Sequence, residues 1–180
     1  MAANGSHELV TDSIYTALIQ LMKTKPYPEI KIKDIVDRAG VSRMAYYRNF
    51  ETKDEILTKR LKIKLEGFEQ KLENHSCLTE EAYWIEFFEA FQTDSVIVHM
   101  MKAGLVNQIM QAHKEFTLRM YEQIFHWDMS DPHNLMVTYQ RMGCVIGLML
   151  YSIEHQEADS HLMAQQISQL IIKDQQTTSF

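Results

Sequence analysis

The chain has 180 residues, 46% of them hydrophobic, with a formal net charge of −6, six glycines and three prolines. This hydrophobic content excludes a chain that is disordered over most of its length, and the scarcity of glycine and proline favours an all-α fold. Cys77 and Cys144 lack metal-binding or redox spacing, and the longest apolar run, residues 142–151, is about half of the ~20 residues that cross a bilayer. We therefore expect a cytoplasmic protein without a membrane span.

The charge is distributed unevenly along the chain. Residues 1–60 contain ten Lys and Arg against eight Asp and Glu, a net +2, whereas residues 61–180 contain eight against sixteen, a net −8. An acidic average therefore hides a weakly basic N-terminal part, in which a nucleic-acid partner remains possible.

The first two predicted helices are separated by prolines. Apolar residues from Val10 to Met22 recur on one helical face, and Pro26 and Pro28 prevent that helix from continuing. A second, shorter helix over about 32–39 should end at Gly40 in the left-handed conformation that glycine adopts at helix ends.

A third helix should follow after a tight turn. Ser42 can cap it, and it should run through Arg48 and close at Phe50, which makes a helix-turn-helix with the second helix. Thr52 and Glu55 then form a capping box that opens a fourth helix reaching about residue 73. The length of this helix suggests a connector to a second domain.

The remainder of the chain predicts five further amphipathic helices. With the first four they give an all-α chain of about nine helices, divided into a helix-turn-helix domain over 8–57 and a second domain over 58–176. The five predicted helices span 79–92, 95–110, 114–126, 132–156 and 160–173.

The segment IKIKDIVDRAGVSRMAYYRNFETKDEIL, residues 30–57, resembles the DNA-binding domain of TetR-family transcriptional regulators. The resemblance covers about residues 8–60, and beyond it only helical pattern and length agree with the family. It implies a three-helix DNA-binding head, a connector helix and a C-terminal ligand-binding and dimerisation domain. The matching residues are Ile30, Asp34, Ile35, Ala39, Gly40, Val41, Ser42, Tyr47, Phe50, Lys53, Glu55, Ile56 and Leu57.

On the third helix, Val41, Tyr46 and Phe50 should face a small core, so that the intervening residues project outward into a major groove. An arginine at the start of such a helix can bond both O6 and N7 of a guanine. The resemblance implies that Tyr47 and Lys53 bind backbone phosphate, with Lys33 and Asn49 completing that set. The predicted DNA-binding residues are Lys33, Ser42, Arg43, Met44, Ala45, Tyr47, Asn49 and Lys53.

Two positions qualify this resemblance. Lys31 replaces the family's usual helix-capping threonine and cannot accept an amide hydrogen bond, so we expect a weaker start to the second helix. Arg48 lies between the two faces of the third helix and could pair with Glu51 or Asp54, so we leave it outside the DNA-binding set. Taken individually, Arg43, Arg48 or Lys53 would more often be a solvated surface charge than a DNA contact.

The stretch YQRMGCVIGLMLYSIEH is the predicted dimer contact. Its two glycines are four residues apart on one helix face, where another backbone can approach closely, and it resembles the family's penultimate helix. The alternative is packing within the chain around two small residues. The predicted interface residues are Gly143, Gly147, Met142, Ile146 and Leu150.

Residues 84–125 are rich in aromatic residues and methionine, as in apolar pockets with a few polar anchors. The family resemblance favours a pocket for a small apolar or amphipathic effector, and the alternative is a packed core without a cavity. The predicted pocket residues are Trp84, Phe88, Met100, Met101, Asn107, Phe116, Met120 and Tyr121.

The histidines show no metal-ligand spacing, and no catalytic motif occurs, so we expect neither a metal nor an enzyme, and no cofactor beyond an unidentified effector. We expect a ligand-responsive repressor that binds a (pseudo)palindromic DNA operator as a homodimer. The alternatives are a helical co-regulator that binds a protein partner instead of DNA and, third, a small-molecule enzyme. The effector, the operator and the sign of regulation are not encoded in recognisable form.

Overall fold

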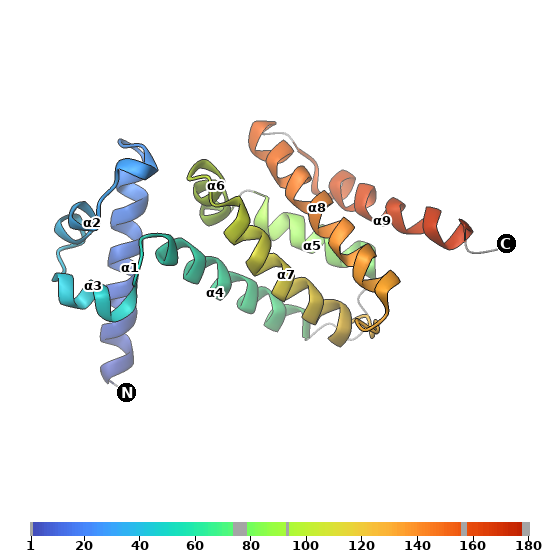
Figure 1. Cartoon of the computed structure of the whole chain (residues 1–180), viewed down its shortest axis with the longest axis horizontal. Coiled ribbons are helices and arrows are strands. Elements are labelled where there is room, and N and C mark those ends of the chain that lie inside the picture. The colour runs from blue at the N-terminus through green and yellow to red at the C-terminus, as the bar shows by residue number, and fades with distance from the viewer. Residues whose placement is uncertain (1, 74–78, 93, 156–157, 178–180) are drawn as a thin grey trace.

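The computed structural model describes residues 2–73, 79–92, 94–155 and 158–177, and this part of the chain is all-helical. Helices α1 to α3 form a head at one end, α4 leads out of it, and α5 to α9 form a body around α4 (Figure 1). The predicted all-α fold is confirmed. The described elements are α1 (Ala2–Met22), the 3-10 helix η1 (Tyr27–Glu29), α2 (Ile32–Ala39), α3 (Arg43–Asn49), α4 (Asp54–Glu73), α5 (Glu80–Phe91), α6 (Ser95–Lys102), α7 (Val106–Gln123), α8 (Pro132–Glu154) and α9 (Ser160–Thr177).

The head is held together by one apolar core. Ile14 and Leu18 of α1, Ile35 of α2 and Tyr46 of α3 are all fully buried in it. Because α2 and α3, with eight and seven residues, are too short to be stable alone, burial of these side chains is what keeps them helical.

The turn between α2 and α3 follows its local signals. Gly40 adopts φ +67°, and its N–H bonds to Val36 O, which ends α2. The Ser42 hydroxyl accepts a 3.0 Å hydrogen bond from the N–H of Ala45, which caps α3. Both predicted helix ends are confirmed.

Asp34, rather than the residue before the helix, caps the start of α2. The Lys31 side chain makes no capping bond, but the Asp34 carboxylate accepts a 3.0 Å hydrogen bond from the Lys31 N–H. Lys25 lies 2.8 Å from the same carboxylate, and these two contacts lower the pKa of Asp34. The weaker start expected from Lys31 is therefore offset by Asp34.

The η1 turn of the head is hydrogen-bonded to Lys53, the residue that precedes α4. The Lys53 ammonium donates to three backbone carbonyls of the η1 turn, at 2.6 Å to Tyr27, 3.3 Å to Pro28 and 3.0 Å to Ile30. It also lies 4.4 Å from the centre of the Tyr27 ring, whose hydroxyl donates to Asp54 at 2.6 Å. Burial, with this bond to Asp54, raises the pKa of Tyr27. We call this set of contacts the Lys53 latch.

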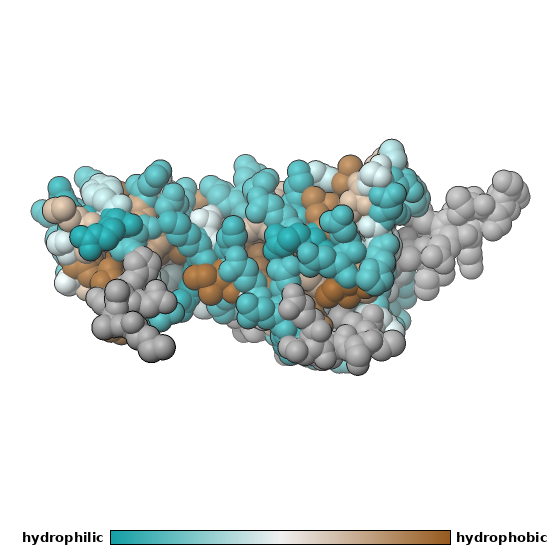
Figure 2. All heavy atoms as spheres, turned by 90° about the horizontal axis from the view of Figure 1, so that it is seen from below, coloured by the Kyte–Doolittle hydropathy of each residue, from teal (hydrophilic) through white to brown (hydrophobic). Residues whose placement is uncertain are grey.

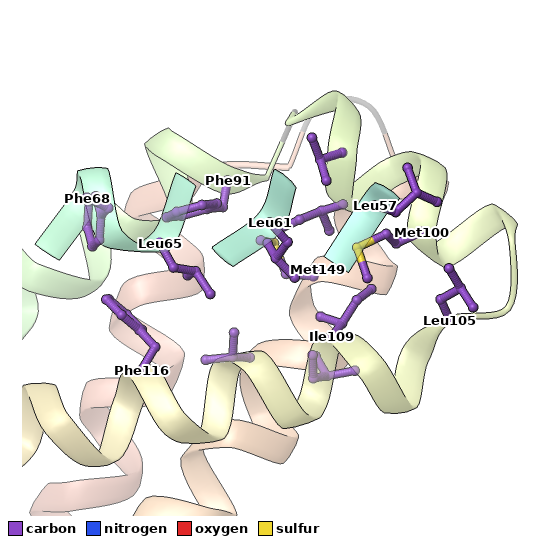
Figure 3. Packing of buried hydrophobic residues seen from close by; sticks show 14 of the residues in the cluster. Leu57, Leu61, Leu65, Phe68, Phe91, Met100, Leu105, Ile109, Phe116 and Met149 are labelled. Atoms are coloured by element: carbon purple, nitrogen blue, oxygen red, sulfur yellow. The ribbon is translucent and has the colours of Figure 1, made fainter. Parts of the chain in front are cut away.

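The body packs around the connector helix. Leu61 and Leu65 of α4 point toward Ile109 and Phe116 of α7, with Met149 of α8 beside them (Figure 3). On another side, α5 lies along α9. Most apolar side chains are thereby taken from water, and the face in Figure 2 is mainly hydrophilic with separate hydrophobic patches.

The boundary between α6 and α7 differs from the prediction of helices over 95–110 and 114–126. The chain breaks at Gly104, with φ +75°, and α7 then continues without interruption through Gln111 and His113. The N–H groups of Gly104 and Leu105 bond back to Met101 and Met100, which closes α6 two turns earlier than predicted.

A buried charge lies where α5, α7 and α8 meet. Arg141 is fully buried, and its guanidinium donates to the Glu80 carboxylate and to the Tyr121 hydroxyl. It also lies 4.8 Å from the centre of the Trp127 ring. The charge is thus neutralised by one carboxylate, and the rings of Tyr121 and Trp127 stabilise it further through cation–π contacts.

His113 is a second buried polar residue, on α7. Its side chain is 3% exposed, and neither ring nitrogen has a hydrogen-bond partner within the described part of the protein. Burial lowers the pKa of His113 to about 4, so that the imidazole is neutral at neutral pH.

No helix in the described ranges is long and apolar enough to cross a membrane, and no described cluster of His, Cys, Asp and Glu could hold a metal ion. Cys144 is a free thiol, and Cys77 lies outside the described residues.

The Lys53 latch predicts that Lys53→Met destabilises the protein, because three carbonyls lose the hydrogen bond from the ammonium. We expect the free energy of unfolding, measured with urea by circular dichroism, to fall by about 2 kcal/mol. Lys62→Met, at an exposed position of α4, is the control and should change the free energy of unfolding little. Equal losses in the two variants would mean that the latch contributes nothing.

His113 predicts a pH dependence of stability. Since its pKa is about 4 in the folded chain against ~6.5 in the unfolded one, its contribution is complete above pH ~6.5 and is lost as the pH falls toward 4. We expect roughly 2 kcal/mol of the unfolding free energy to be lost between about pH 7 and 5. His113→Leu should remove this part of the loss, whereas His161→Leu, at an exposed position, should keep it.

Candidate nucleic-acid interface

One face of α3 points away from the head core. Tyr46 is fully buried behind it, whereas Met44 and Tyr47 are 77% and 57% exposed, and Arg43 and Arg48 are exposed beside them. We call Arg43, Met44, Tyr47 and Arg48 the reading face of α3. It combines two cations with a phenol and a thioether, which suits contact with phosphates and base edges.

Ser42 and Ala45 lie at the edge of the reading face. The Ser42 oxygen accepts the capping bond from Ala45, but its hydroxyl proton is still available to donate to a phosphate. Ala45 is half-buried, so only part of its methyl group faces outward. Lys33 is exposed in the first turn of α2 and offers a free cation near the turn.

The other two predicted phosphate-binding residues are already engaged. The Asn49 amide donates to Ala45 O at 2.7 Å, and its oxygen is buried. All three N–H groups of Lys53 point to carbonyl oxygens of the η1 turn. In this geometry the three donors of the Lys53 ammonium are all used within the head, whereas the Asn49 amide keeps one of its two N–H groups.

The N-terminal end of α4 is also unfavourable for a phosphate. Its first turn carries Asp54 and Glu55, whose negative charges oppose an anion there. Glu55 accepts a hydrogen bond from the Glu51 N–H at 3.1 Å and contacts Lys59 at 3.2 Å, and both interactions lower its pKa. These carboxylates stabilise the helix dipole in place of a phosphate.

Arg48 is exposed on the reading face, although it is not in the predicted DNA-binding set. Its suggested partner Asp54 is bonded to Tyr27 instead, and within the described ranges Arg48 makes no ion pair. The signal was present, because Arg48 follows Met44 by four residues and so lies on the same side of the helix.

The predicted dimer contact on α8 divides into two faces. Met142 and Ile146 are only 2% and 8% exposed and belong to the inside of the chain, so their assignment to an interface is wrong. Gly143 and Gly147 are exposed, and a Cβ at either would meet nothing within 4 Å. The exposed side of the helix, which we call the outer face of α8, carries Met136, Tyr139, Gly143, Gly147, Leu150 and Tyr151.

The predicted effector pocket is largely packed core. Asn107 is exposed, and Met101 borders a small cavity next to α4. The Tyr121 hydroxyl is occupied by Glu80 and Arg141. The aromatic residues pack on one another at ring distances such as 5.7 Å for Trp84 and Phe87. Fully buried in that core are Trp84, Phe88, Met100, Phe116, Met120 and Tyr121.

Comparison with known proteins supports this interface. The family model of bacterial regulatory proteins, tetR family, matches residues 14–59, from the middle of α1 into α4. No curated protein matches the chain. A solved structure, a TetR transcriptional regulator from Streptococcus agalactiae 2603V, is similar in fold, with a TM-score of 0.63 at 14% identity over 95% of this chain and 98% of that one. The N-terminal head of the chain, residues 14–59, thus matches the tetR family of bacterial regulatory proteins, and the whole described fold is that of a TetR transcriptional regulator.

Proposed function

We propose that this transcriptional regulator is a non-enzymatic, ligand-responsive repressor that acts in the cytoplasm and binds a (pseudo)palindromic operator as a homodimer. The observation that carries the proposal is the reading face of α3, which the Ser42 cap and the buried Tyr46 hold on a fixed scaffold. Because its cations and Tyr47 extend outward from that scaffold, they can enter a major groove without a costly rearrangement. The proposed units are a DNA-binding domain over 8–57 and a regulatory domain over 58–176.

Dimerisation is supported by the outer face of α8. A single helix-turn-helix reads few base pairs, so two heads related by a twofold axis fit the two halves of a palindrome. The outer face of α8 offers apolar side chains around two glycines, at which a second helix can approach closely. We include Gly143, Gly147 and Leu150 from the prediction in this interface and add Met136, Tyr139 and Tyr151.

The ligand response follows from the position of α4. This helix is attached to the head by the Lys53 latch and to α7 by the Arg119 guanidinium, which bonds both oxygens of Glu69 at 3.0 and 3.2 Å. A ligand that binds the body better in one orientation of α4 than in another would shift the spacing of the two heads and release the operator.

A second function has an observation in its favour. Asn49 and Lys53 make their contacts within the head, and Met44 and Tyr47 give the reading face an apolar centre. Such a face also suits a protein partner, as in a co-regulator attached to another DNA-bound protein.

The two functions differ in their salt dependence. A purified repressor should bind a palindrome next to its own gene, with an affinity that falls steeply as salt rises, because phosphate contacts release counterions. Absence of salt-sensitive binding to any such duplex at low salt would favour the co-regulator. Fluorescence anisotropy with labelled duplexes measures both quantities.

The reading face predicts separate effects for Arg43 and Lys33. Arg43→Ala should weaken the operator much more than random DNA, because it removes ~1–3 kcal/mol of base discrimination. Lys33→Ala should weaken both DNAs and reduce the salt slope by about one unit per head. Lys62→Ala on α4 is the control and should leave affinity and slope unchanged. Equal loss on operator and random DNA for Arg43→Ala would remove Arg43 from base reading.

The outer face of α8 predicts that Gly147→Gln weakens the dimer. The new side chain has room within one chain but would occupy the space of the second helix, so we expect the dimer dissociation constant to rise by at least about tenfold. Sedimentation equilibrium measures this constant. Gly67→Gln, at an exposed glycine in α4 that also has open space, is the matched control. A wild-type chain that is monomeric at micromolar concentration would contradict the proposed dimer.

A further inference from the structure

Met44 is the most exposed large apolar side chain in the described ranges. It is 77% exposed and is not among the described apolar residues that pack against the core. Helix α3 lies at the end of the molecule remote from the body, so the described body helices leave Met44 uncovered (Figure 1). A single exposed apolar residue is common on protein surfaces, so exposure alone assigns it no role.

The position of Met44 in α3 is that of a base contact. It lies in the first turn, next to Arg43, and the N-terminal residues of a recognition helix are those that contact base edges. Residues three and four positions later share its side of the helix, and these are Tyr47 and Arg48. Met44 is therefore an apolar group flanked along α3 by two exposed cations.

The backbone that carries Met44 is held firmly, while its thioether is free to adapt. Ser42 caps the first turn of α3, and the Tyr47 ring contacts the buried Tyr46 ring edge-to-face at 5.3 Å between centres. The unbranched side chain of methionine can then change rotamer to fit the surface that it meets. Met44 can thus pack closely against a base edge without a rearrangement of the helix.

The chemistry of the thioether determines which base edge it suits. In the major groove, guanine, adenine and cytosine present hydrogen-bonding groups, whereas thymine presents a C5-methyl group beside its O4 acceptor. Methionine has no donor, and its sulfur accepts only weakly, so over a polar edge it would displace water without replacing the lost hydrogen bonds. Contact with the thymine methyl group instead removes two apolar groups from water, which is favourable.

We propose that Met44 reads thymine: its thioether packs against the C5-methyl group of one thymine in each operator half-site. The inference rests on the proposed DNA-binding function and specifies part of the operator. Because Arg43 and Met44 are consecutive in the chain, this thymine lies within a few base pairs of the base that Arg43 contacts.

Replacement of thymine by deoxyuridine tests this contact, because it removes the methyl group and keeps the base pair. The probe is a duplex that the full-length protein selects from a random library, and each thymine of its half-site is replaced in turn. At one position we expect the wild type to bind about fourfold less tightly per half-site, as for one methyl group that is no longer buried. Met44→Ala should bind this duplex and its parent equally, measured by fluorescence anisotropy.

Two further variants separate the methyl contact from other effects. Met44→Leu keeps an apolar side chain and should still discriminate against deoxyuridine by at least about twofold. Met110→Ala removes an exposed methionine from α7 and should keep the full effect of the wild type. Since Met44 does not pack against the core, its variants should retain the circular dichroism spectrum of the wild type.

The role of Met44 and the DNA-binding function fail in different ways. A selected half-site in which no deoxyuridine weakens binding would overturn the reading of thymine and leave the DNA-binding function intact. The same conclusion follows if Met44→Ala keeps the discrimination of the wild type at every thymine, because another residue would then contact the methyl group. Failure of the protein to select any duplex at low salt would refute both.

Discussion

The Lys53 latch ties the turn between α1 and α2 to the start of α4, and the ion pair of Arg60 with Asp12 at 2.8 Å adds a tie between α4 and α1. The turn between α1 and α2 contains two prolines, which lack N–H groups, so its carbonyls have few backbone donors nearby. A single ammonium supplies three N–H groups to that turn while the following residue, Asp54, holds the Tyr27 hydroxyl. The turn and the first residues of α4 therefore form one unit, and any rotation of α4 carries the reading face with it.

The inner face of α8 stabilises the fold of one chain, whereas its outer face is available for association with a second chain. Successive helical residues are rotated by about 100°, so Met142 and Ile146 point inward while Gly143 and Gly147, each one residue later, point outward. The inward residues contribute to the core of one chain. Because the glycines have no side chains, the backbone of α8 is accessible on its outer face. The neighbouring Leu150 supplies apolar area beside them.

Local signals in the sequence were sufficient for the helix-turn-helix and insufficient for the contacts made across the fold. Gly40 and Ser42 act within a few residues, and the structure has both where they were predicted. The family resemblance implies that Lys53 binds phosphate, and nothing local in the sequence points to its carbonyl partners, which lie more than twenty residues away. Similarly, aromatic content cannot distinguish a packed core from a cavity, and His113 carried no motif. The break at Gly104 was visible as a glycine, but the continuous apolar pattern concealed it.

The buried Arg141 restricts which substitutions this protein can accept. Loss of Glu80 would leave the guanidinium uncompensated in the core, and loss of Arg141 would leave the half-buried Glu80 carboxylate without its partner. Two apolar residues together are far better tolerated than one, because no charge then remains. The two positions, sixty-one residues apart, are therefore expected to vary jointly among descendants. A lineage that loses one of them passes through a poorly folding intermediate unless the second substitution arises with it.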